Sequence, residues 1–164
     1  MKHSASLLAG LALALAGLFA GCRSAPLDYQ PATARFYLET SQTGSNVVTL
    51  PKSGLKLAIG ATPVLAEGDI VNVELVQVEL GKCLMFSLTT AAGRDLYRFS
   101  ASNQGRRFVL LIDGAAVGAR RVEAPLNEGT IFMFVEVPDD ALPALVTRLK
   151  KTSADLQRAI AKKK

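Results

Sequence analysis

Histidine and tryptophan are almost missing from this chain of 164 residues. Tryptophan does not occur, and the single histidine is His3, next to the N-terminus. Imidazole is the usual base of catalytic triads and the commonest metal ligand in proteins. The body of the chain therefore has no residue for Ser-His-Asp or Cys-His catalysis, or for a histidine-based metal site.

The first 21 residues have the three parts of a secretory signal peptide. Lys2 gives a charged start, residues 7–19 form an apolar run, and Ala20 and Gly21 are small residues at the expected cleavage point. The apolar run is shorter than the ~20 residues that a membrane-spanning helix needs. We therefore expect residues 1–21 to be removed from the mature protein.

Cys22 follows this signal directly. The sequence Leu18-Phe19-Ala20-Gly21-Cys22 resembles the lipobox of bacterial lipoproteins, with Phe19 where leucine is commonest. The resemblance implies a diacylglyceryl group on the Cys22 thiol, cleavage before it and acylation of the new amine. The alternative is an ordinary secretory signal with a chance cysteine at its boundary. Because Arg23, and not aspartate, follows the cysteine, analogy favours a lipid anchor in the outer membrane, facing the periplasm.

Cys83 is the other cysteine, and it has no internal partner if Cys22 carries lipid. It lies in the apolar, strand-like stretch 82–88, where an unpaired cysteine is usually a small buried hydrophobic residue. The alternative, a reactive thiol, requires a nearby histidine or cation. One cysteine alone also cannot form a zinc site.

Carboxylates are the remaining candidates for chemistry, and each has a structural explanation. Asp139 and Asp140 are adjacent at an expected helix start, and Glu67 and Asp69 flank a glycine in a turn. Asp113 precedes a glycine, a strong turn signal. The glycine-rich stretch 114–118 lacks the lysine and hydroxyl of a phosphate-binding loop. We therefore expect no enzyme activity, no metal and no cofactor.

The mature chain of 143 residues is of a size typical of one domain. We expect a lipidated tether over 22–32, an α+β domain over 33–150 and a basic helix end over 151–164. The net charge of +5 is a feature of the C-terminus, because residues 22–147 hold 11 basic and 13 acidic residues. Nucleic acid is therefore not an expected partner.

Hydrophobic periodicity predicts eight strands and two helices. The strands are expected at 33–40, 47–50, 55–59, 72–80, 82–88, 107–112, 116–122 and 130–137. A helix is expected over 89–102, with Thr89 as its N-cap, and another from Pro138 onward, with acids in its first turn. The order predicts an α+β fold, with a mixed, mainly antiparallel sheet and two helices packed on one face.

A family resemblance begins at about residue 63 and ends at about 151. It rests on a helix followed by Gln104-Gly105-Arg106-Arg107, a strand ending Ile112-Asp113-Gly114, the turn Asn127-Glu128-Gly129, then a strand and a helix. This order resembles the head subdomain of the large periplasmic domain of SecD, half of the SecDF protein-export complex. Gly118-Ala119-Arg120 departs from the family's Ser-Ala-Pro, and the proton-conducting transmembrane helices are absent from the sequence. The resemblance implies a fold and a tendency to contact polypeptide in the envelope.

Two functions from different classes fit these observations. The first is a membrane-anchored, non-enzymatic binding or accessory module that contacts exported or envelope polypeptides, with an exposed sheet edge near 47–50 or 116–122 as the contact. The alternative is a structural envelope protein whose basic C-terminal helix binds anionic lipid or wall polymer. The expected partners are the membrane, through Cys22, and a protein of unknown identity.

Overall fold

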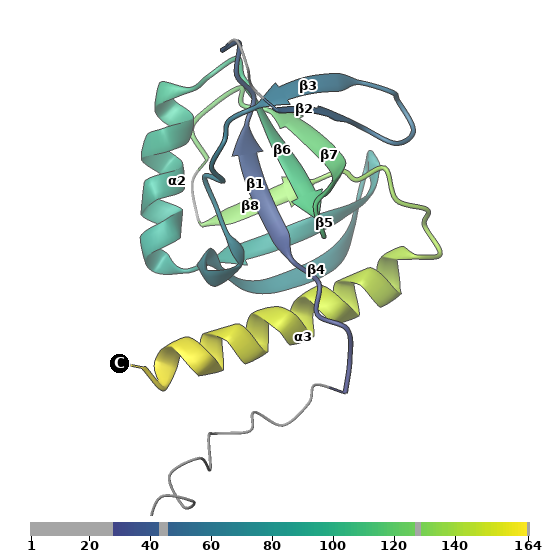
Figure 1. Ribbon diagram of the computed structural model, residues 1–164, viewed down its shortest axis with the longest axis vertical. Helices are drawn as coiled ribbons and strands as arrows, with labels where there is room; N and C mark the ends of the chain where they lie inside the picture. The colour runs from purple at the N-terminus through teal and green to yellow at the C-terminus, as the bar shows by residue number, and fades with distance from the viewer. Residues whose placement is uncertain (1–27, 43–45, 127–128, 164) are drawn as a thin grey trace, which may run out of the picture.

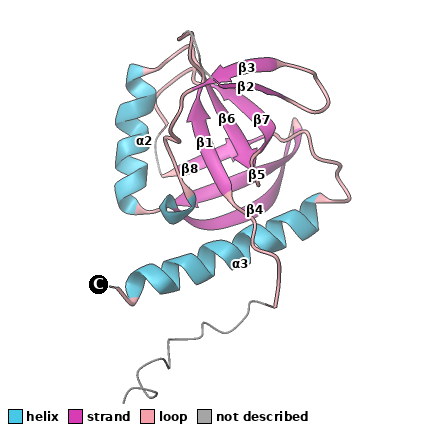
Figure 2. Ribbon diagram, viewed as in Figure 1, coloured by secondary structure: helices cyan, strands magenta, loops and turns pink. Residues whose placement is uncertain are grey.

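Two helices lie against three small antiparallel sheets in this computed structural model, which describes residues 28–42, 46–126 and 129–163 (Figure 1). The strands are β1 (Ala34–Leu38), β2 (Asn46–Thr49), β3 (Lys56–Ile59), β4 (Ile70–Val78), β5 (Gly81–Leu88), β6 (Arg107–Ile112), β7 (Ala115–Arg121) and β8 (Thr130–Met133). The helices are α2 (Thr90–Ser102) and α3 (Leu142–Ala161), with a short 3-10 turn, η2 (Glu67–Asp69). The predicted α+β class is confirmed, and Figure 2 shows its two helices and its strands by colour.

The first sheet has the order β1-β6-β7. Its central strand, β6, is apolar along almost its whole length, and Phe108, Val109 and Leu110 are all fully buried. A strand that is covered on both faces lacks a polar face. The apolar sequence of 107–112 predicts such a strand, and β6 confirms it. Asp113 and Gly114 both have positive φ angles in the tight turn from β6 to β7.

The second sheet has the order β4-β5-β8. The predicted hairpin of β4 and β5 is confirmed, and Gly81 takes a positive φ angle at its turn. The predicted last strand, 130–137, is too long, because β8 ends at Met133. Beyond it the chain runs past β7, where the Glu136 amide donates to the Val117 carbonyl oxygen at 2.6 Å.

The two larger sheets share one hydrophobic core. Phe36 of β1 and Phe86 of β5 meet edge to face, with ring centroids 5.0 Å apart, and neither side chain is exposed. A smaller cluster of Leu50, Leu57 and Ile59 packs the β2–β3 hairpin against Val109 of β6. The hairpin is thus attached to the outer face of the first sheet.

Helix α2 begins as its sequence predicted. The Thr89 hydroxyl accepts a hydrogen bond from the Ala92 amide at 3.2 Å, which is the role of an N-cap. Leu96 is buried and Phe99 stacks on Phe108 of β6, with ring centroids 6.0 Å apart. The apolar side of α2 therefore covers the core.

The start predicted for the last helix is wrong by four residues. Helix α3 begins at Leu142, with Pro143 in its first turn, and has no acid there. Pro138, Asp139 and Asp140 instead form the turn before it, in which the Ala141 amide donates to the Pro138 carbonyl oxygen. Two prolines with similar helix-start signals lie close together here, and the apolar face beginning at Leu142 selects the second.

Candidate interaction surface

A groove of about 480 Å³ lies between the β4–β5 turn, β7 and β8. Its lining residues come from all three places in the fold: Leu80, Ala119, Arg120, Arg121, Glu123, Phe132 and Phe134. The groove combines large apolar side chains with two arginines. We call it the β7–β8 groove.

Three apolar side chains of the β7–β8 groove are exposed to solvent. Leu80 is 85% exposed, Phe132 40% and Phe134 44%. The alternation of β8 explains the phenylalanines, because Ile131 and Met133 point into the core and their neighbours point out. Exposed apolar side chains that lie together on one face are typical of binding surfaces.

Arg120 forms part of the wall of the β7–β8 groove. Its guanidinium donates to the carbonyl oxygen of Phe132 at 3.1 Å, so it occupies a backbone acceptor on the outer edge of β8. The two arginines outnumber Glu123, and the groove therefore has a positive rim. Both the apolar floor and this charge favour an apolar ligand that carries a carboxylate.

The two sheet edges expected to add a strand differ in how open they are. β7, within the range 116–122, has lost part of its edge to the segment after β8, since Phe134 and Glu136 run beside Gly118 and Val117. Among the described strands, β2, within the range 47–50, pairs with β3 alone, and its Val47 is 63% exposed. The sequence prediction did not include the groove that lies between β7 and β8.

A second hollow, of about 750 Å³, borders the first half of α2. Thr89, Arg94, Tyr97 and Gly129 are among its lining residues. The β7–β8 groove is the smaller of the two hollows, but it presents more exposed large apolar side chains.

Four of the five candidate carboxylates, Glu67, Asp69, Asp113 and Asp139, have partners within the fold, and Asp140 is exposed. Glu67 pairs with Arg35 at 2.7 Å, and Asp69 accepts from the Ala66 amide at 2.9 Å. Asp139 lies 3.0 Å from the Lys82 ammonium. No group of three or more acidic, histidine or cysteine residues that could hold a metal ion occurs among the described residues.

Cys83 lies on β5 with 1% of its surface exposed, and burial raises the pKa of its thiol. Arg120 acts in the opposite direction on this pKa but is the smaller influence. A thiol with a raised pKa forms little thiolate, which is the reactive form. The prediction of a buried position is confirmed. Cys22, the predicted lipidation site, lies outside the described residues.

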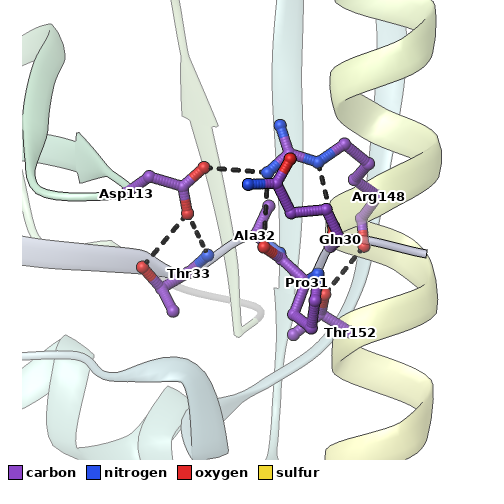
Figure 3. A network of polar contacts seen from close by, with 7 residues as sticks. All are labelled: Gln30, Pro31, Ala32, Thr33, Asp113, Arg148 and Thr152. Carbon is purple, nitrogen blue, oxygen red and sulfur yellow. Dashed lines mark hydrogen bonds and ion pairs between the residues drawn. The ribbon is translucent and has the colours of Figure 1, made fainter. Parts of the chain in front are cut away.

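The described end of the predicted tether lies along α3. Arg148 donates to the carbonyl oxygens of Gln30 and Pro31, at 3.0 and 3.2 Å, and pairs with Asp113 at 3.0 Å (Figure 3). The same carboxylate accepts from the Thr33 amide at 2.8 Å. We call residues 29–33 the strap.

Two further contacts hold the strap. The Ala32 amide donates to the Thr152 hydroxyl at 3.0 Å, and the Tyr29 hydroxyl donates to Asp155 at 2.7 Å. This bond from Tyr29 is the main reason that the pKa of Asp155 is lowered. Lys151 lies over the Tyr29 ring, 5.3 Å from its centre. Contacts with two turns of α3 therefore fix where the chain enters the domain.

The basic C-terminal stretch continues α3 without a break at residue 150. Its helix buries Leu149 and Ser153 against the sheets. Among the described residues, no helix is long and apolar enough to cross a membrane.

Comparison with known proteins gives structural neighbours only. No model of a known protein family matches the sequence, and neither does any curated protein. One solved structure, of a membrane component SecDF that enhances protein export, matches with a TM-score of 0.55 and 13% identity. A structure of SecDF, a translocon-associated membrane protein from Thermus thermophilus, matches with a TM-score of 0.51 and 14% identity.

These matches cover most of this chain but less of the SecDF chains. The first includes 76% of this chain and 63% of that chain, and the second 76% and 20%. At such low identity the likeness concerns the fold, not the activity. The resemblance predicted from residues 63–151 is confirmed at this level: the chain has a SecD-like fold.

Proposed function

We propose that this chain is a membrane-anchored lipoprotein of the cell envelope and a non-enzymatic module that binds polypeptide in the β7–β8 groove. The observation that carries the proposal is the group of exposed side chains Leu80, Phe132 and Phe134 beside Arg120. The SecD-like fold supports a polypeptide as the ligand, because the SecDF of one similar solved structure is a membrane component that enhances protein export.

The expected ligand is an extended segment that has both apolar and acidic side chains. Burying one large apolar side chain contributes about 1.5–3 kcal/mol, so two or three such contacts are sufficient for weak, reversible binding. The positive rim selects a carboxylate near the apolar contacts. Because Arg120 occupies the Phe132 carbonyl oxygen, recognition is by side chains and not by an added strand.

The anchor rests on Cys22 and its lipobox-like surroundings. A lipid on Cys22 would hold the groove at the membrane surface, in the envelope compartment where exported chains emerge. Outer-membrane attachment is part of the proposal and follows from Arg23. Cys22→Ala should abolish labelling by a radioactive fatty acid and release the protein from membranes, whereas retention of the variant on membranes would contradict the anchor.

The structural alternative, in which the basic helix end is the functional part, leaves the exposed apolar side chains of the β7–β8 groove without a role. Among the basic residues of α3 and its end, Arg148, Lys151 and Arg158 have partners inside the fold, whereas among the described residues no carboxylate lies within ion-pair distance of Lys162 or Lys163. Deleting residues 150–164 would also remove the half of α3 that buries Ser153, so deletion cannot separate the two functions. Charge-changing variants at the exposed lysines are the cleaner tool.

A peptide titration tests the proposed groove. The probe is a fluorescein-labelled peptide with alternating leucine or phenylalanine and glutamate, and binding is followed by anisotropy. Leu80→Ser/Phe132→Ser should weaken binding by at least about tenfold, the scale of a lost hot spot. The control, Val47→Ser/Leu55→Ser, removes exposed apolar side chains from β2 and the turn before β3 and should bind like the parent. Equal binding by all three proteins would contradict the proposal.

A further inference from the structure

The strap limits how far the domain can move from its anchor. Tyr29, Ala32 and Thr33 are all held, by Asp155, Thr152 and Asp113 in turn. The stretch from Cys22 to Asp28, which we call the leash, is the length of chain between the proposed lipid and the strap. At about 3.3–3.6 Å for each residue, the six steps from Cys22 to Asp28 span at most about 20–22 Å at full extension.

This reach is short compared with the domain. A domain of this length has a radius of gyration of about 14 Å, so it is wider than the leash is long. The leash joins the domain at α3, and Figure 1 places α3 and the first described residues on the side opposite the β2–β3 hairpin. A lipid on Cys22 therefore keeps α3 near the membrane and the hairpin away from it.

The outward side of α3 is basic. Lys150, Lys151, Arg158, Lys162 and Lys163 are all exposed. The only acid of the helix, Asp155, is half-buried and is engaged by Tyr29 and Arg158. Among the described residues, no carboxylate lies within ion-pair distance of Lys162 or Lys163, and Lys150 has only a loose pair with Glu74, at 3.7 Å.

From this leash and this charge we propose that the outward face of α3 docks on anionic phospholipid headgroups of the membrane that holds the lipid anchor. Each lysine near an anionic surface raises the binding constant by roughly fivefold at physiological salt, and the short leash keeps the helix at high local concentration. Docking would leave the β2–β3 hairpin pointing away from the bilayer. The inference rests on the proposed lipidation of Cys22.

Two fluorescent labels measure how the domain is oriented relative to the membrane. The mature lipidated protein is placed in phosphatidylethanolamine vesicles with or without phosphatidylglycerol, which also contain a headgroup-linked quencher. A label at Ala154→Cys reports the outward face of α3, and a label at Val47→Cys reports the hairpin. Cys83 is buried and does not compete for the label. With phosphatidylglycerol we expect several times more quenching at position 154 than at position 47.

A matched pair of charge variants tests whether the basic charge of α3 causes the quenching at position 154. Lys162→Gln/Lys163→Gln and Lys56→Glu each change the net charge by two units, the first on α3 and the second on β3. The first should reduce the quenching at position 154 to about half or less, as should high salt, and the second should leave it unchanged. Equal quenching at positions 154 and 47, or equal effects of the two variants, would overturn the proposal.

The result is separable from that of the peptide titration. Lys162→Gln/Lys163→Gln should bind the peptide like the parent protein, and Leu80→Ser/Phe132→Ser should keep the orientation in the vesicles. Absence of fatty-acid label on Cys22 would overturn the docking proposal and leave the groove intact. Binding of the helix to an acidic polymer but not to the vesicles would also overturn it.

Discussion

Gly118 in β7 lies so close to the carbonyl oxygen of Phe134 that a Cβ at position 118 would be 2.5 Å from that oxygen. Backbone atoms form this obstacle, so no side-chain movement can relieve it. The close approach fixes the path of the chain after β8, and with it the position of Phe134 in the β7–β8 groove. A glycine is required here for space and not for its φ angle.

Gly118→Ala should therefore destabilise the protein by about 1–3 kcal/mol, the usual cost of overpacking. The control is Gly60→Ala, where the nearest atoms would be 3.8 Å from the new Cβ and the free energy of unfolding should stay within about 0.5 kcal/mol of the parent. Urea unfolding measures both. Equal stability of the two variants would show that β7 and the segment after β8 are not in close contact.

The Phe36–Phe86 contact should contribute much of the packing energy between the two larger sheets. Phe36→Ala removes a fully buried ring and should lower the free energy of unfolding by about 3–5 kcal/mol. Tyr97→Ala, at a side chain that is 47% exposed, is the matched control and should cost much less. In a double-mutant cycle, Phe36 and Phe86 should show a coupling of about 0.5–1.5 kcal/mol. A coupling of zero would refute the contact.

Glu136 should make the attachment of the β2–β3 turn depend on pH. Its pKa is lowered, chiefly by a hydrogen bond with the Ser53 side chain and also by the Ser53 and Lys52 amides, which donate at 2.9 and 2.6 Å. A lowered folded-state pKa means that the ionised group stabilises the fold above its ordinary pKa of 4.5. This stabilisation is lost as the pH falls through the lower, folded-state pKa.

Glu136→Gln should therefore be less stable than the parent at pH 7, and the difference between the two should shrink as the pH falls from 4.5 through the lower pKa of the folded state. The measurement is the urea midpoint of both proteins across this pH range. Taking the difference between them removes the effects of the other carboxylates. A difference that is constant with pH would contradict this role for Glu136.

The Cys83 thiol should be unreactive in the folded protein. Burial raises its pKa and also shields it from reagents. In Cys22→Ala, which leaves one thiol, modification by a chromogenic disulfide at pH 8 should be slower by orders of magnitude than in urea. Rapid modification without urea would show that β5 is open to solvent at this position.

Local features of this fold could be predicted from its sequence because they depend on neighbouring residues. The Thr89 N-cap, the apolar run of β6 and the Asp113-Gly114 turn are examples. The start of α3 cannot be placed from the sequence because Pro138 and Pro143 carry the same local signal. The packing of Leu142, which decides between them, is a tertiary contact.

The groove could not be predicted in the same way. Leu80, Ala119 and Phe132 lie on separate hairpins or strands, and only the pairing of β5 with β8 and the path of the chain past Gly118 bring them together. A signal did exist in β8. The alternation that buries Ile131 and Met133 places Phe132 outward, in a chain with only seven phenylalanines. An outward phenylalanine in a strand is a reason to look for a binding surface.

Site-specific photo-crosslinking in intact cells tests the binding claim most directly. A photo-reactive phenylalanine analogue replaces Phe132 in the β7–β8 groove, and in a second protein it replaces Tyr97 on the exposed side of α2. We predict crosslinks to envelope or exported polypeptides from position 132 that Leu80→Ser reduces, and few from position 97. Equal crosslinking from both positions, or none from position 132 in a folded, membrane-bound protein, would contradict the account.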